Sequence, residues 1–285
     1  DLTKRLPVGD PDDRDLKVGC GTAVEGTVLA LAKRGIGAQV TWLDDEGPSP
    51  RPFARVTAGG TPHESDVDLA AHVHKRTTHR AGFLPVQDTR LATLSSPHVT
   101  LVTDPADIAW LSNQIDRASA LLLRDPALRR ELLDWMRLSR GQTGYESEGL
   151  NRETLCMDGL TARIARPVLG SSLYDALSRL GLGPALSGER ARTSSASAIA
   201  LFHWPADGSL FEAGRAFYRT WLEATALGLV GWPAAALADH AETKAEVSAR
   251  FGVPTTDRLI NTLRLGRAKG ATPSRTRLAV SEVIN

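Results

Sequence analysis

The sequence predicts an α+β fold in which helices dominate. Residues 106–139 carry a strong helical pattern that is interrupted near Pro126, and GSLFEAGRAFYRTWLEATALG reads as one long helix. The sheet is indicated by SAIALFHW (197–204), a short run of apolar, β-branched and aromatic residues that is typical of a buried strand.

The elements before these follow from their flanking residues. Residues 1–19 are rich in Asp, Pro and Gly and predict a loop, whose acidic cluster lacks the Gly and distal Glu of an EF-hand and is interpreted as a solvated turn. Apolar residues on one face predict a helix over 20–34, which Gly35 stops. AQVTWL (38–43) predicts a short strand, and a loop-rich stretch leads to a helix over 66–76.

The later elements carry clear start signals. Asp88 is placed to cap a short helix, HVTLV (98–102) predicts a strand, and Asp125 is placed to cap the second part of the long helical region. Residues 140–195 are mixed, with Gly- and Ser-rich loops. KAEVSARFG predicts a further helix, and INTLRLGRA (260–268) the last strand.

Composition excludes several classes of protein. The 285 residues include 34 Lys and Arg against 33 Asp and Glu, and the net charge of +1 argues against a nucleic-acid binder held by bulk electrostatics. No apolar run approaches the roughly 20 residues of a membrane span, and no signal peptide is visible. Cys20 and Cys156 suit a reducing cytosol and are interpreted as packed small hydrophobes. We therefore expect a cytoplasmic protein without a membrane partner. Because the chain starts at Asp1 without Met, we also expect a native N-terminal segment to be missing.

One internal repeat is visible. CGTAVEGTVLALAKRGI (20–36) and AGRAFYRTWLEATALGL (213–229) superpose without a gap. The matched positions are Gly21 with Gly214, Ala23 with Ala216, Thr27 with Thr220, Leu29 with Leu222, and Gly35 with Gly228. Two helices can share a few letters by chance. The alternative is a duplicated or pseudo-dimeric architecture, in which the small residues allow close approach of another helix or of something flat.

A basic segment, HKRTTHRAGF (74–83), has three interpretations. It could be a solvated surface turn, a histidine metal site or a socket for a phosphate. In an extended conformation Arg76, Thr78 and Arg80 project to one side, where guanidinium and hydroxyl groups can converge on phosphate oxygens.

The metal interpretation would use His72, His74 and His79. It is disfavoured because His72 and His74 do not share a helical face, no acidic ligand accompanies them, and the neighbouring cations repel a metal ion. We expect no metal site.

A second basic pair, Arg275 and Arg277, stands in PSRTRLAVSEV. Together, RTTHR and SRTR resemble the R-x-S/T-x-R and C-terminal K/R-x-R motifs of the FMN-binding nitroreductase superfamily. The resemblance implies that both elements grip the FMN phosphate and ribityl chain, and that AGRAFYRTWLEATALGLVGWP supplies the family's central helix and the Gly/Pro turn beneath the flavin ring. Gly231 and Ala235 are then the expected points of backbone approach to the ring.

The order of these segments, with ELLDWMRLS after them, is similar to the Acg-type actinobacterial nitroreductase-like proteins. That resemblance implies a nitroreductase-like fold with a central, mostly antiparallel sheet flanked by helices. It also implies two fused halves that resemble a nitroreductase dimer: a degenerate half over 1–65 and a more complete half over 66–285 that carries the FMN phosphate clamp. The match is poorest around 140–195.

This sequence departs from the family in two places. The Asn-Thr-Gln-Pro-Trp-like segment before the first helix cannot be assigned, because the sequence begins at Asp1. Where active members carry Pro-x-Glu-Gly, this chain has Pro233-Ala234-Ala235-Ala236, which lacks the acidic side chain.

Three functions follow from the resemblance. The first is an FMN-dependent oxidoreductase of the nitroreductase type, with NADH or NADPH as reductant and hydride transfer through flavin N5 to a small organic acceptor such as a nitroaromatic, a quinone or a specialised metabolite. The second is an FMN-sequestering flavoprotein with little or no turnover. The third is a member that has lost flavin and serves as an interaction scaffold. The family also implies a homodimer.

Overall fold

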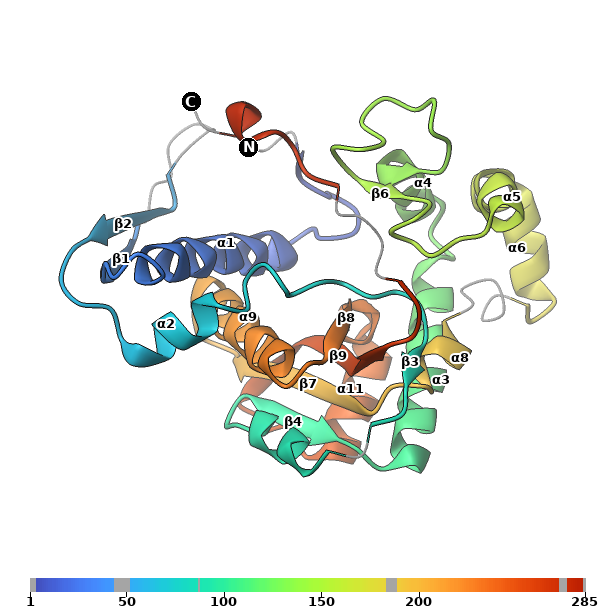
Figure 1. Ribbon diagram of the computed structural model, residues 1–285. Helices are drawn as coiled ribbons and strands as arrows, with labels where there is room; N and C mark the ends of the chain where they lie inside the picture. The colour runs from blue at the N-terminus through green and yellow to red at the C-terminus, as the bar shows by residue number, and fades with distance from the viewer. Residues whose placement is uncertain (1–3, 44–51, 87, 183–188, 272–275, 284–285) are drawn as a thin grey trace.

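A five-stranded antiparallel sheet forms the centre of the molecule (Figure 1). The computed structural model describes residues 4–43, 52–86, 88–182, 189–271 and 276–283. The strands lie in the order β3 (Phe83–Leu84), β9 (Asp257–Ala268), β7 (Ala198–Pro205) and β4 (Val99–Val102), and β8 (Val230–Ala234) pairs with β9. Helices flank this sheet, so the expected α+β class with a central antiparallel sheet is confirmed.

Both faces of the sheet are covered, which explains the continuous apolar run of β7. Alternate residues Ala198, Ala200 and Phe202 pack with α9 (Leu210–Ala226) in one core cluster. Ile199 and Leu201, which point the other way, pack in a second cluster. That second cluster includes residues of α3 (Pro105–Leu122), α10 (Ala236–Asp239) and α11 (Ala241–Phe251).

The cap signals read from the sequence are correct at two places. The Asp88 side chain accepts from the backbone N–H of Arg90 at the start of η2 (Thr89–Leu94). The Asp125 side chain accepts from Ala127 N–H at 2.7 Å, at the start of α4 (Pro126–Trp135).

The N-terminal part differs from its prediction. The first helix, α1 (Arg14–Ala32), begins six residues earlier than expected, because the buried carboxylate of Asp10 accepts from the backbone N–H of Asp15 at 3.1 Å and of Leu16 at 2.8 Å. The expected loop after β1 (Ala38–Trp42) contains a second strand, β2 (Ala54–Ala58), which pairs with β1 in antiparallel register. The next helix, α2 (Glu64–Ala70), ends six residues before the predicted end.

The two repeat helices pack against each other, with α1 lying across α9 (Figure 1). A Cβ atom on Gly21 would lie 2.1 Å from the carbonyl oxygen of Phe211, and one on Gly214 would lie 2.1 Å from that of Val18. Each glycine therefore meets the residue three positions before the other, so the contact is reciprocal. The close helix approach expected at these small residues is confirmed.

A group of smaller elements stands at the side of the molecule (green to yellow in Figure 1). It contains α4, β5 (Met136–Arg137), β6 (Leu150–Asn151), α5 (Gly159–Leu169) and α6 (Ser172–Arg179). After it, α8 (Arg190–Thr193) returns to the sheet, and η3 (Val280–Glu282) lies near the end of the chain. No helix in the described part of the chain has the length and apolar character that a membrane crossing requires.

Candidate functional site

The predicted basic segment lies along the edge of β8. After α2 the chain turns, with the backbone N–H groups of Lys75 and Arg76 donating to the carbonyl of His72. Thr78 then forms a parallel bridge with Gly231, and His79 N–H donates to the Gly231 carbonyl at 2.9 Å. Two stretches 153 residues apart, which the sequence analysis assigned to one site, are therefore neighbours in the fold.

Gly231 is required by packing. A Cβ atom there would lie 2.5 Å from Nε1 of Trp221 and 2.9 Å from Cδ1 of Leu263. The Gly/Pro turn expected at this point is wrong: residues 230–234 are strand β8, paired with β9, and the turn lies earlier at Gly228, whose φ is +79°. Proline has no backbone N–H to donate to a neighbouring strand. Pro233 is tolerated because, among the described strands, β8 pairs with β9 alone and so lies at an edge.

Ala235 follows the strand as the residue before α10. Its backbone is helical, with φ −77° and ψ −21°. Its carbonyl accepts from the backbone N–H of Ala238 at 2.7 Å and of Asp239 at 3.0 Å. The turn out of β8 is therefore fixed by backbone hydrogen bonds rather than by an acidic side chain.

Arg76 lies on an aromatic surface of α9. Its guanidinium carbon is 4.4 Å from the ring centroid of Trp221 and 5.9 Å from that of Tyr218, within cation–π range. The indole Nε1 of Trp221 is buried and has no hydrogen-bond partner among the described residues. A buried N–H donor without an acceptor is uncommon in folded proteins.

Arg80 points to a different neighbourhood. Its guanidinium donates to the carbonyl of Thr154 at 3.3 Å, and Arg192 donates to the carbonyl of Arg80 at 3.3 Å. Burial lowers the pKa of Arg80, and the charge of Glu189 opposes this shift. Within the described ranges Arg80 has no ion pair, so its charge is poorly compensated. Arg76 and Arg80 thus flank Thr78 with different protein partners.

Arg264 is a further basic residue of this region, which the sequence analysis missed. It is 1% exposed, lies in β9 and stacks on Trp232 of β8, with its guanidinium carbon 3.4 Å from the ring centroid. Its guanidinium donates to Glu189 and to Thr193 at 2.8 Å each. Burial lowers its pKa, and the charge of Arg80 lowers it further. An arginine between two leucines in a predicted strand was the available signal.

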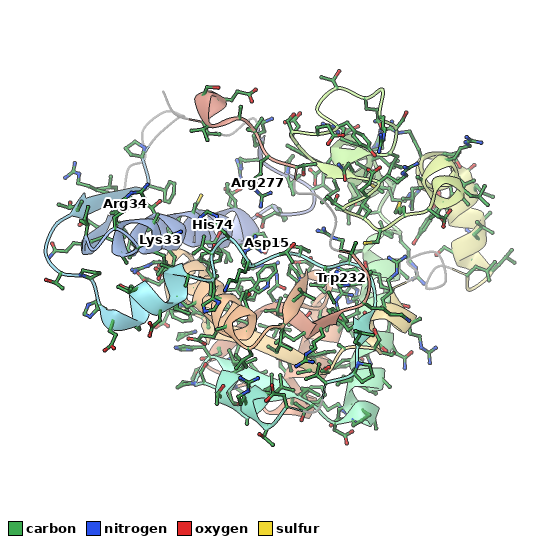
Figure 2. The ribbon with its side chains drawn as sticks, in the orientation of Figure 1. Asp15, Lys33, Arg34, His74, Trp232 and Arg277 are labelled. Carbon is green, nitrogen blue, oxygen red and sulfur yellow. The ribbon has the colours of Figure 1, made fainter. Side chains whose placement is uncertain are left out.

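The C-terminal basic pair is described in part. Arg275 lies outside the described residues. Arg277 is exposed and donates to the carbonyl of Thr276, whose hydroxyl contacts the Gly149 carbonyl at 3.4 Å. Figure 2 shows Arg277 on the C-terminal segment, above Asp15 and Trp232 in that view. Both Arg80 and this segment therefore contact the stretch 149–154.

The fold encloses His79 and partly encloses Cys20. His79 is fully buried, and its ring Nε2 lies 3.0 Å from the Gly82 carbonyl. Burial raises the pKa of the Cys20 thiol, which disfavours the thiolate. Among the residues that the structure describes, no group of three or more His, Cys, Asp or Glu side chains could hold a metal ion.

The carboxylate at the end of α10 is the acidic group that follows β8. Asp239 pairs with Arg14 of α1 at 2.5 Å, and Arg14 also contacts Asp15 at 2.7 Å. Burial raises the pKa of Asp239 to about 6; Arg14 opposes that shift, whereas Asp15 and Asp10 add to it. Burial works to lower the pKa of Arg14, and the two carboxylates raise it above its ordinary value.

Comparison with known proteins returned structural neighbours only. No family model and no curated protein matches the sequence. An FMN-bound nitroreductase from Bacteroides fragilis is 14% identical, with a TM-score of 0.43, over 76% of this chain and 98% of that one. The FMN-dependent nitroreductase NfnB from Mycobacterium smegmatis, solved with NADPH, is 19% identical, with a TM-score of 0.43, over 76% and 97%. A BluB-like flavoprotein from Clostridium difficile is 13% identical, with a TM-score of 0.44, over 76% and 97%. At these sequence identities and TM-scores, the structural similarity does not assign this chain to a family.

Proposed function

We propose that this protein is an FMN-dependent oxidoreductase of the nitroreductase type, acting on a small organic acceptor with NADH or NADPH as reductant. The observation that carries the proposal is the pairing of Thr78 with Gly231, which joins the predicted phosphate-binding segment to the predicted ring-binding strand.

The residues present fit an anionic, aromatic cofactor. Arg80 is a partly buried guanidinium with one carbonyl partner and no ion pair in the described ranges, so it has donors left for phosphate oxygens. The indole N–H of Trp221 is a buried donor without an acceptor beside Gly231. A phosphate group would satisfy the donors of Arg80, whereas the Trp221 N–H has no accessible surface and its neighbours would have to move before a ring acceptor could reach it.

Each residue has a definite role under this proposal. Arg76, Arg80 and Arg277 would balance the phosphate charge, with Arg275 two residues before Arg277, and the Thr78 hydroxyl would donate a further hydrogen bond. Gly231 and Ala235 would be the points where the backbone approaches the flavin ring. When bound, FMN supplies the capacity to accept and donate hydride.

An absorbance spectrum tests the proposal. We expect purified protein to stay yellow after incubation with FMN and removal of the unbound flavin, and to bleach anaerobically with NADPH or NADH. Arg277→Ala, an exposed side chain whose loss leaves packing intact, should weaken FMN binding by roughly ten- to a hundredfold, as expected for one charge-assisted contact. Arg55→Ala, on the β1–β2 hairpin, is the matched control and should bind as wild type. Protein that stays colourless would refute flavin binding.

The absence of an acidic side chain after Pro233 supports a second candidate, an FMN-sequestering flavoprotein with little turnover. Three alanines follow Pro233, and the next carboxylate, Asp239, is already paired with Arg14. Yellow protein that bleaches with dithionite but not with either nicotinamide would select this candidate over the enzyme.

We also propose that residues 1–65 and 66–285 are unequal halves of a duplicated unit, as in the Acg-type proteins. Beyond the reciprocal glycine contact, both repeat helices end alike, at Gly35 and Gly228 with φ +75° and +79°. The N–H groups of Ile36 and Leu229, one residue later, each donate five residues back at 3.1 Å. A homodimer and a cytoplasmic location remain proposals of the same kind.

A further inference from the structure

A basic cavity of about 600 Å³ lies in the side elements, between α5 and the loops around β5 and β6. Four arginines line it, Arg140, Arg152, Arg163 and Arg166, together with the side chain of Tyr145. Its volume is within the range that small-molecule sites occupy. None of the predicted flavin-binding residues lines this cavity.

Positive charge in this cavity exceeds negative charge. Glu153 is the one carboxylate that forms an ion pair with these arginines in the described part of the chain, at 3.3 Å from Arg140 and 3.2 Å from Arg152. The Tyr145 hydroxyl, which also donates to Glu153, is the main cause that lowers the pKa of this carboxyl to about 2, so it is ionised at neutral pH. Four cations against one anion leave a local charge of about +3.

Three of the four arginines already have partners before any ligand binds. Arg140 and Arg152 are held on Glu153, and Arg166 donates to the Leu133 carbonyl at 2.9 Å. The Gln142 side chain accepts from the backbone N–H of Leu138 at 2.7 Å, which pins the loop beside them. Donors that are already oriented lose less entropy when an anion binds.

Arg163 completes the set and differs from its neighbours. It is exposed on α5 and has no hydrogen bond or ion pair with any described residue. Its guanidinium donors are therefore available to a ligand without breaking an existing contact.

We propose that this cavity binds the phosphomonoester group of a small molecule. A phosphomonoester carries nearly two negative charges at neutral pH and three acceptor oxygens, which suits several converging guanidinium groups. A single carboxylate would leave about two of the three excess charges uncompensated. The proposal does not depend on flavin binding, although the wall is continuous with Arg80 through the stretch Arg152–Thr154.

Calorimetric titration of the full chain with AMP tests the proposal, with adenosine as the uncharged control and inorganic phosphate to isolate the phosphate contact. We expect AMP and phosphate to bind and adenosine not to bind. Arg163→Ala should weaken AMP binding by about tenfold or more, and Arg163→Glu should abolish it. Arg130→Ala, an exposed arginine of α4 outside the cavity, should bind as wild type.

Two results would overturn the proposal. One is the absence of AMP and phosphate binding at millimolar concentration in wild-type protein whose circular dichroism shows it folded. The other is binding that Arg277→Ala weakens and Arg163→Ala leaves unchanged, because phosphate would then occupy the predicted flavin clamp. The absorbance test with FMN reports on the predicted FMN phosphate clamp and not on this cavity. Failure of one proposal therefore does not imply failure of the other.

Discussion

At the scale of single residues, two arginines near the candidate site differ in how their charge is compensated. Arg264 is almost fully buried, yet it is neutralised by Glu189, held by Thr193 and stacked on Trp232, so its desolvation is compensated. Arg80 is partly buried near it and lacks such a carboxylate within the described ranges. That difference separates a structural arginine from one suited to a ligand anion.

Asp239 provides a test of pH dependence at this scale. Burial raises the pKa of its carboxyl to about 6, so its contribution to stability is fully present below the ordinary value of 3.8 and is lost as pH rises through 6. We expect Asp239→Asn to flatten this dependence, narrowing the loss in unfolding free energy between pH 4 and pH 7 by about 1–2 kcal/mol after allowing for solvent screening. Urea unfolding at several pH values measures it; parallel pH profiles for the two proteins would contradict it.

The sequence predicted the role of single residues correctly where that role depends on residues nearby in the sequence. The caps at Asp88 and Asp125 needed only the next two residues. Arg264 was missed because its partners Glu189 and Thr193 are 75 and 71 residues away. The same limit applied to Trp221, whose unpaired N–H is visible only once Gly231 is placed against it.

At the scale of elements, long local patterns were predicted well and paired elements were not. The helix now seen as α9 and the strand β7 carry their own periodicity, and both were recognised. The strands β2 and β8 were missed because they are defined by pairing with β1 and β9. Gly and Pro residues beside β2 and within β8 suggested loops and turns.

The contact between α1 and α9 gives a prediction for paired glycines. Gly21→Ala would place a Cβ atom 2.1 Å from a backbone carbonyl, so the helices must separate, and we expect a loss of about 1–3 kcal/mol in unfolding free energy. Gly19→Ala, in the same helix, meets nothing within 4 Å and should instead gain about 0.5–1 kcal/mol from helix propensity. Thermal or urea unfolding of both variants measures the difference, and equal effects of the two would show that the close approach is absent.

The whole molecule combines a tightly packed centre with a loosely packed side. The sheet and the helices on its two faces supply the large core clusters, and α1 adds a further cluster of Leu29, Leu69 and Leu222. In α5 and α6 only Ala162 and Tyr174 are buried, while Leu160 and Leu180 are 70% and 76% exposed. In α5 and α6, which lie within the stretch where the family resemblance was poorest, few side chains are therefore buried.

Hydrogen exchange tests this difference in packing between the side elements and the sheet. Segments with few buried apolar contacts open at lower free energy than core strands, so we expect amides of α5 and α6 to exchange at least about tenfold faster than those of β7 and β9 after correction for intrinsic rates. Polar contacts connect this side to the centre, among them the donation from Tyr174 to the Ala120 carbonyl at 3.5 Å and from Arg129 to the Leu123 carbonyl at 2.7 Å. If AMP occupies the cavity beside α5, it should slow exchange in α5 and leave β7 unchanged, because a ligand adds its binding free energy to the opening of the segment that holds it. Equal protection of α5 and β7 in the free protein would mean that these few polar contacts join the side elements to the sheet as one cooperative unit.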